Sequence, residues 1–208
     1  AISLNGEPTL YSRLSEFLEI CHQPGVSTFL VTNGSLPKVI EKLDTLPTQL
    51  YVSVDAPNKE IFDRICKPKF DTNAFYKLEQ TLELLPSLDT RTVCRHTLIK
   101  GESLGHHEEY ARLDNLADPM FIEAKGYVHV GKSQNNHTIE NMPNHTEVLD
   151  FSNKLASLVG REVLSDRSES RVALIGKEMI PITLPKKIRD LPSDLGIAKP
   201  QNFSLPQV

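Results

Sequence analysis

The sequence has few cysteines, and no two of them lie close together. Cys21, Cys66 and Cys94 form no C-x-x-C pair, so the 208 residues contain no recognisable zinc or iron–sulfur motif. Three isolated cysteines also argue against the disulfide framework of a small secreted protein. The simplest interpretation is a cytoplasmic protein whose thiols are reduced.

Long apolar runs and a surplus of positive charge are missing as well. No segment approaches the length of a membrane span and no signal peptide opens the chain, so we expect no membrane partner. The formal net charge is -4, whereas binding to nucleic-acid phosphates usually requires a basic surplus. This balance weighs against nucleic-acid binding by the surface as a whole, but it leaves room for a local basic patch.

An initiator methionine is also absent, and the chain opens on residues that resemble a strand. We therefore interpret it as a fragment. Short β-branched runs then alternate with segments of helical periodicity. Strands are expected at 2–4, 28–31, 50–54, 92–99 and 121–124, and helices at 14–21, 37–43, 75–85 and 106–116.

This alternation is typical of βαβ units and predicts an α/β fold with a parallel sheet. A partial TIM-like barrel and a doubly wound sheet both fit, and both bind ligands at the carboxyl ends of their strands. From residue 127 the pattern becomes polar and irregular, followed by a helix near 149–159 and a strand at 172–175. We expect a barrel core at 1–126, an α+β extension at 127–180, and a proline-rich tail at 181–208 that is a wrapping arm or disordered.

Polar residues follow the first three expected strands. The turn Asn5-Gly6-Glu7 would place a carboxylate where a ligand ammonium could sit, although a plain turn with a solvated Glu7 is equally consistent. Asn33 lies in a second turn. Ser53 and Asp55 share one face at the end of the third strand, where they could bind ribose hydroxyls or cap the following loop.

The last two strands of the expected barrel carry charges. Arg95 lies within a parallel strand, where it is costly to bury unless it meets an anion. Glu123 and Lys125 share a face of the next strand and could form an ion pair or act in catalysis. Every strand thus ends in polar residues aimed the same way, and packing alone does not explain that pattern.

Six blocks of the sequence, in this order, resemble the tRNA 4-demethylwyosine synthase family of radical S-adenosylmethionine (SAM) enzymes. They are SLNGEPTLY at 3–11, TFLVTNG at 28–34, PTQLYVSVDA at 47–56, TLIKG at 97–101, FIEAKGYVHVGKSQ at 121–134 and SESRVAL at 168–174. The resemblance covers roughly residues 1–176. The GEP block alone indicates only a radical SAM enzyme, whereas the ordered set is specific for this family.

The resemblance implies a partial (β/α)6 barrel that here lacks its first strand, together with SAM and a [4Fe–4S] cluster as cofactors. The family is a group of tRNA-modifying carbon–carbon lyases. They condense carbons of pyruvate with N1-methylguanosine at position 37 of tRNA(Phe), and a flavodoxin or ferredoxin supplies electrons. The family's cluster cysteines, second cluster and proposed Schiff-base lysine are expected upstream of residue 1, so no metal ligand is expected in this chain. The chain alone is therefore expected to be inactive.

The resemblance also suggests roles for individual residues. Asn5, Gly6 and Glu7 match the block that holds the SAM amino group, Ser53 matches a ribose contact with Asp55 and Asn33 nearby, and Ile99 lies in the segment against adenine. The expected substrate side comprises Arg95, Glu123, His129, Lys132 and Ser133, with Lys125 as the candidate catalytic residue. The sequence departs from the family at Glu102-Ser103, where relatives carry a Tyr-Asn-type turn.

Two other functions remain open from the sequence. A class I aldolase-like barrel could use Lys125 as a Schiff base if the pKa of this lysine were lowered, without a cluster. A non-catalytic RNA-binding module is the third possibility, and the acidic balance weighs against it.

Overall fold

Six strands form a single sheet in the order β1-β2-β3-β4-β6-β5 in the computed structural model, which describes residues 1–3, 6–69 and 71–187. Four of them are parallel: β1 (Phe29–Thr32), β2 (Gln49–Ser53), β3 (Arg91–Leu98) and β4 (Phe121–Gly126). β6 (Val172–Gly176) pairs antiparallel with β4, and β5 (Glu162–Arg167) pairs antiparallel with β6. The parallel part carries its carboxyl ends at one edge, as a barrel segment requires.

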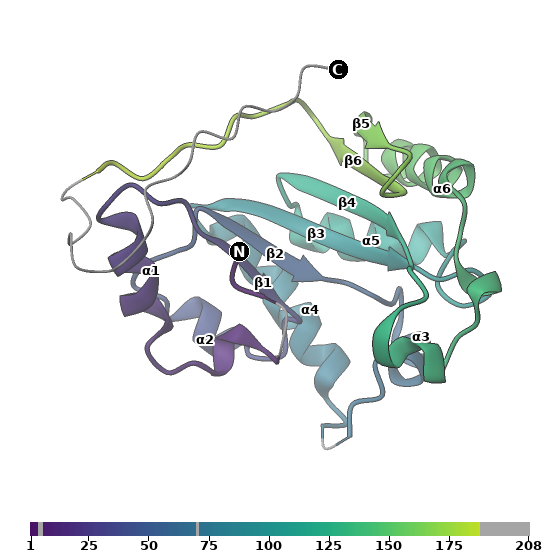
Figure 1. Ribbon diagram of the computed structural model, residues 1–208, viewed down its shortest axis with the longest axis horizontal. Coiled ribbons are helices and arrows are strands. Elements are labelled where there is room, and N and C mark those ends of the chain that lie inside the picture. Colours follow the sequence, from purple (N-terminus) through teal and green to yellow (C-terminus); the bar gives the residue numbers. More distant parts are fainter. Residues whose placement is uncertain (4–5, 70, 188–208) are drawn as a thin grey trace.

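Helices connect the parallel strands, and α4 and α5 lie behind the sheet in Figure 1. The helices are α1 (Leu14–His22), α2 (Pro37–Glu41), α3 (Lys59–Ile65), α4 (Ala74–Leu84), α5 (His107–Ala117) and α6 (His145–Leu158). Short 3-10 helices are η1 (Pro8–Leu10), η2 (Leu85–Ser87), η3 (Gly131–Asn135) and η4 (Ile139–Asn141). In the described ranges, none of these helices has the length and apolar character that crossing a membrane requires.

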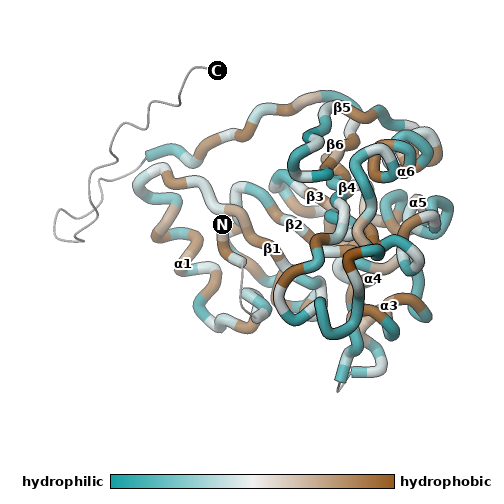
Figure 2. Tube along the Cα trace, turned by 45° about the vertical axis from the view of Figure 1, so that its right-hand side comes forward, coloured by the Kyte–Doolittle hydropathy of each residue, from teal (hydrophilic) through white to brown (hydrophobic). Residues whose placement is uncertain are grey.

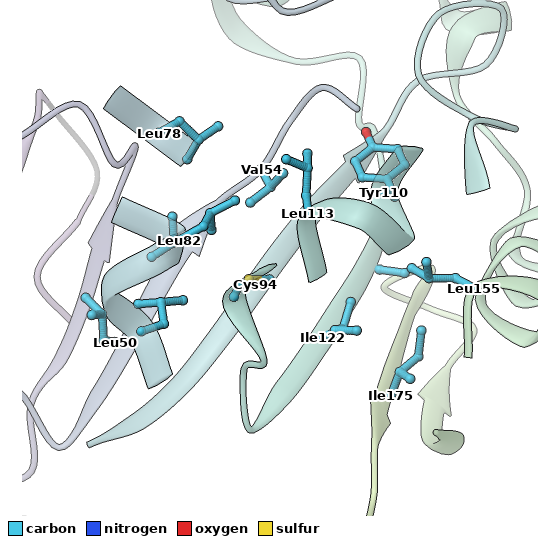
Figure 3. Close-up of a cluster of buried hydrophobic side chains, with 14 of the residues drawn as sticks. Leu50, Val54, Leu78, Leu82, Cys94, Tyr110, Leu113, Ile122, Leu155 and Ile175 are labelled. Atoms are coloured by element: carbon cyan, nitrogen blue, oxygen red, sulfur yellow. The ribbon is translucent and has the colours of Figure 1, made fainter. Parts of the chain in front are cut away.

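The core lies between the sheet and the helices, because side chains alternate between the two faces of each strand. Leu50, Val52 and Val54 are fully buried, whereas Tyr51 and Ser53 between them are partly exposed. Figure 3 shows strand residues such as Leu50 facing helix residues such as Leu82. The other face of the sheet carries the polar and charged residues, and it is this face that can receive a ligand.

The structure confirms the α/β class and the α+β extension, and it corrects three details. The expected strand at 2–4 is reduced to a parallel bridge between Ile2 and Leu30, and Leu4 lies outside the described residues. α3 and β5 were not predicted. The sheet is mixed rather than parallel, because β6 returns antiparallel to β4 and brings the extension into the same sheet.

The chain after β6 runs in an extended path toward α1 (Figure 1). Arg91 at the start of β3 donates a hydrogen bond to the carbonyl of Ile180. Figure 2 shows hydrophobic residues scattered along this segment, and Ile182 and Leu184 are exposed. Residues 181–187 of the proline-rich tail follow this path toward α1, while residues 188–208 lie outside the description.

Candidate cofactor-binding site

A cavity of about 380 Å³ lies at the carboxyl ends of β1 and β2. Its wall includes Asn33, Ser53 and Asp55, which were predicted from the sequence as cofactor ligands. The opposite wall comes from α3, the start of α4 and the loop between them, and includes Lys69 and Lys77. The structure thus brings together three side chains from two strand ends that are about twenty residues apart in sequence.

Glu7 reaches the end of β1 from the turn before η1. Its Oε1 accepts hydrogen bonds from Thr32 Oγ1 at 2.6 Å and Thr9 Oγ1 at 2.7 Å, and its Oε2 accepts from the Asn33 amide at 2.8 Å. Gly6 permits the turn because its φ is +80°, a conformation that side chains disfavour. A carboxylate offers about four lone-pair positions, so Oε2 retains capacity for one more donor.

Asn33 is fixed by its backbone and by one atom of its side chain. Its Oδ1 accepts a hydrogen bond from the Ser35 amide at 2.9 Å, which shapes the turn into α2. Its Nδ2 has no hydrogen-bond partner among the described residues. The free NH2 group at the cavity can therefore donate to a ligand. Asn5, the other amide predicted here, lies outside the described residues.

Asp55 stands just beyond β2, on the same face as Ser53. Burial raises the pKa of its carboxyl group, and hydrogen bonding to Thr97 and the nearby charges of His96 and Arg95 only partly offset this effect. Ser53 itself lies next to Arg95 in the sheet register. The cavity thus combines a hydroxyl with a carboxyl group, a pair that suits the two hydroxyls of a ribose.

The anion that Arg95 meets is a carboxylate of the protein itself. Arg95 Nε lies 2.7 Å from Glu123 Oε1, with side chains that are 30% and 16% exposed. The guanidinium also stacks over the Tyr51 ring at 4.9 Å. The ion pair expected between Glu123 and Lys125 is therefore wrong, and Glu123 of β4 pairs instead with Arg95 of β3.

Lys125 is half-buried on the open face of β4, beside Thr97 in the register. It has no hydrogen bond or ion pair with any residue that the structure describes. This ammonium is therefore accessible to a ligand on the open face.

Ile99 presents little free backbone to a ligand. Its amide donates to Ser103 Oγ at 3.0 Å, and its carbonyl accepts from the amides of Glu102, Ser103 and Leu104. The side chain is buried. A contact with adenine at Ile99 would therefore have to use the surface of this turn and not a free amide.

Two of the predicted substrate residues stabilise the loop after β4. Ser133 Oγ accepts from the Tyr127 hydroxyl at 2.9 Å and donates to the Val130 carbonyl, and His129 Nε2 lies 2.9 Å from the His137 carbonyl. Lys132 is exposed. The structure brings His129, Lys132 and Ser133 together in one loop, which is separate from the lining of the cavity.

Residues that sequence reasoning did not select complete the site. Thr32 and Thr97 orient Glu7 and Asp55. Thr97 is the penultimate residue of β3, and the alternation of that strand could have placed it on the face of the site. Thr32 is the last residue of β1, but its partner Glu7 lies 25 residues away, so no local pattern indicates the contact. Among the described residues, no three His, Cys, Asp or Glu side chains gather as metal ligands would.

Two protein-family models match this chain. The radical SAM superfamily matches residues 2–113, which is 112 of the 208 residues, so the chain belongs to this superfamily. A second family, described as wyosine base formation, matches residues 116–177.

The chain is similar to radical SAM proteins that act in wyosine synthesis. S-adenosyl-L-methionine-dependent tRNA 4-demethylwyosine synthase from Pyrococcus horikoshii is 43% identical over 182 residues, covering 86% of this chain and 53% of the relative. The human protein of this name is 36% identical over 184 residues, covering 88% of this chain and 25% of the relative. The chain thus spans about half the length of the archaeal relative and a quarter of the human one.

Solved structures agree with these matches. A structure described as TYW1 with a lysine-pyruvate adduct bound has a TM-score of 0.76 and 39% identity, and covers 85% of this chain and 55% of that chain. The crystal structure of archaeal TYW1 has a TM-score of 0.70 and 35% identity, with the same coverage. The partial radical SAM barrel expected from the sequence is thereby confirmed.

Proposed function

We propose that this chain supplies the cofactor-binding strand ends and part of the substrate face of a tRNA 4-demethylwyosine synthase. This enzyme condenses carbons of pyruvate with N1-methylguanosine at position 37 of tRNA(Phe). The observation that carries the proposal is the cavity where Asn33, Ser53 and Asp55 meet, with Glu7 bonded to its edge. The names of the relatives supply the reaction class.

The residues at the cavity fit SAM. Glu7 Oε2 has capacity to accept from the methionine ammonium, in a charge-assisted hydrogen bond. The free Nδ2 of Asn33 can donate to a carboxylate or a hydroxyl, and Ser53 and Asp55 can bind the ribose hydroxyls. When bound, SAM supplies the deoxyadenosyl radical that starts the reaction in this superfamily.

The [4Fe–4S] cluster has no ligand set in the described part of the chain. Cys94 is buried in the core, and Cys21 and Cys66 belong to different elements. The three cysteines therefore do not hold the cluster. In the proposed enzyme a segment outside this chain holds it, and a flavodoxin or ferredoxin reduces it.

The substrate side of the proposal is the open face of the sheet and the loop above it. Lys125 is the candidate catalytic residue, because its ammonium is free on this face. Arg95 and Glu123 support the face as an ion pair. His129, Lys132 and Ser133 belong to a loop that would meet the tRNA.

Titration of SAM into the cluster-loaded, full-length protein tests the proposal. Replacing Glu7 by Gln removes the negative charge at the ammonium, and a charged hydrogen bond contributes about 1.5–3 kcal/mol, so affinity should fall by roughly one to two decades. Glu41→Gln is the matched control, because Glu41 is exposed and has no ion pair within the described residues. Equal SAM affinities of wild type and Glu7→Gln would show that Glu7 does not bind the SAM ammonium.

A further inference from the structure

A buried histidine links the sheet to the helical layer directly beneath the proposed cofactor site. His96 of β3 is 0% exposed and lies between two partners. Its Nε2 lies 2.9 Å from Asp114 Oδ2 on α5, and its Nδ1 lies 3.1 Å from the carbonyl oxygen of Val54. Asp114 is itself only 2% exposed. Both ring nitrogens therefore have a hydrogen-bond partner, and the ring is shielded from water.

The chemistry of the two acceptors determines where the protons are. A carbonyl oxygen only accepts, so Nδ1 of His96 must carry hydrogen and donate to Val54. The other nitrogen then shares a proton with the Asp114 carboxyl group. Burial lowers the pKa of His96, but the charge and hydrogen bond of Asp114, together with the bond to Val54 and the charge of Asp55, outweigh burial and raise this pKa above its ordinary value. The bond to Val54 is thus present whichever partner holds the shared proton.

The hydrogen bond between His96 and Val54 lies next to the proposed cofactor site. Val54 lies between Ser53 and Asp55, the two residues proposed to bind ribose. β2 ends at Ser53, and the Val54 amide donates to the Arg95 carbonyl at 2.8 Å. The imidazole adds a second link to the same peptide segment, beyond the end of the strand. Two bonds on Val54 therefore fix the direction in which Asp55 leaves the sheet.

We propose that His96 is a positioning residue for the cofactor site, and that its bond to the Val54 carbonyl holds Asp55 in place for the ribose of SAM. This inference rests on the proposed function. Asp114 orients the imidazole from α5, so the end of β2 is tied to the helical layer. A buried histidine with only a packing role would affect stability and leave cofactor affinity unchanged.

Two substitutions separate the positioning role from stability. In His96→Gln the side-chain amide occupies the position of Nε2, so it keeps the contact with Asp114 and loses the bond to Val54. In Asp114→Asn the imidazole is neutral, accepts from the new amide at Nε2 and still donates to Val54. Both variants lose stability, which urea unfolding measures.

The measurement is SAM affinity by calorimetry in the cluster-loaded, full-length protein. Loss of one neutral hydrogen bond predicts about 3- to 10-fold weaker binding for His96→Gln, and Asp114→Asn should stay within about 2-fold of wild type. The double variant His96→Asn/Asp114→Asn places an amide nitrogen at the Nδ1 position and should restore much of the affinity. It also serves as the test if His96→Gln does not fold.

The outcomes distinguish this inference from the function on which it rests. If Glu7→Gln weakens SAM binding and His96→Gln does not, the site is correct and the positioning role is wrong. The positioning role is also wrong if affinity follows stability, so that His96→Gln and Asp114→Asn weaken binding equally. If the wild-type protein does not bind SAM, the proposed function fails together with it.

Discussion

Asp55 is a half-buried carboxyl group of the site, and it forms no ion pair with any described residue. Burial raises its pKa above the ordinary value of 3.8. Because the folded pKa is raised, the contribution of Asp55 to stability is fully present below the unfolded pKa and is lost as the pH rises through the folded pKa. At neutral pH the ionised group therefore destabilises the fold, as is common for residues selected for binding.

Asp55→Asn should consequently raise the free energy of unfolding at about pH 7.5, and this gain should shrink as the pH falls towards about 4. SAM affinity should fall in the same variant, since the ribose loses a charged acceptor. Urea unfolding at the two pH values and SAM titration measure the two effects. Asp150→Asn, at an exposed position on α6, provides the control. A gain that is the same at both pH values would contradict the account.

Lys125 distinguishes the proposed enzyme from the aldolase-like alternative. The proposed enzyme is expected to hold pyruvate on a lysine upstream of this chain, whereas an aldolase would form an imine at Lys125. After incubation with pyruvate and borohydride, peptide mass spectrometry should therefore find no reduced adduct on Lys125. Lys125→Arg removes the nucleophile and is the control. A stoichiometric adduct on Lys125 that is lost in Lys125→Arg would favour the alternative.

The N-terminus of α6 shows how a local sequence signal stabilises an element of the extension. Asn144 Oδ1 accepts from the Glu147 amide at 2.9 Å, and Glu147 Oε2 accepts from the Asn144 amide at 2.8 Å. This capping box satisfies two amides that the helix cannot bond internally. Glu147 also lies 2.5 Å from Lys100 Nζ, and that hydrogen bond lowers the pKa of the Glu147 carboxyl group.

Asn144→Ala should therefore lower the free energy of unfolding by about 1 kcal/mol. Asn153→Ala, at an exposed position inside the same helix, should change stability little or raise it slightly, because Ala has the higher helix propensity. Thermal and urea unfolding compare the two variants. If Asn153→Ala is as damaging as Asn144→Ala, the cap is not the cause.

Elements of the barrel core were predictable because periodicity is a local property. The helical stripe beginning at Phe75 and the alternation around Leu50 both appear in the structure as α4 and β2. α3 was missed because four of its seven residues are charged, so its apolar stripe is too short to recognise. β5 was missed because its side chains are mostly exposed, so it carries no alternation of apolar residues.

The sequence predicted which strand ends form the site, but it did not predict the side-chain contacts between them. Strand ends in a parallel sheet meet at one edge, which placed Asn33, Ser53 and Asp55 together. The bonds of Glu7 to Thr32 and Asn33 join residues 25 and 26 positions apart, and the pairing of Arg95 with Glu123 spans 28. Such contacts depend on strand register and side-chain reach, which periodicity does not determine.

At the scale of the whole molecule, two loops meet above the strand ends although they are far apart in sequence. Lys67 Nζ donates to Asn136 Oδ1 at 2.5 Å, across 69 residues. One loop follows α3 and carries Lys67 and Lys69, and the other contains η3 and Lys132. All three lysines are exposed. The net charge of -4 therefore conceals a local cationic surface beside the cavity.

In the proposed enzyme, this surface predicts how tRNA binding depends on salt. Each lysine that neutralises a phosphate releases a counterion, so its loss should reduce the slope of log K against log salt by about 1. Lys69→Ala and Lys132→Ala should each show this change in the full-length protein with tRNA(Phe), measured by filter binding at several salt concentrations. They should also weaken binding at low salt.

Lys177→Ala is the matched control for the salt experiment. Lys177 is exposed and follows β6, whose last residue, Gly176, pairs with Phe121 at the start of β4. Lys177 therefore lies at the opposite end of the sheet from the cavity, and its loss removes one charge without touching the proposed contact surface. An unspecific effect of net charge would change the slope equally in all three variants, whereas a specific surface requires that Lys177→Ala retain the wild-type slope. Equal slopes in all three variants would show that the tRNA does not contact the loops above the strand ends.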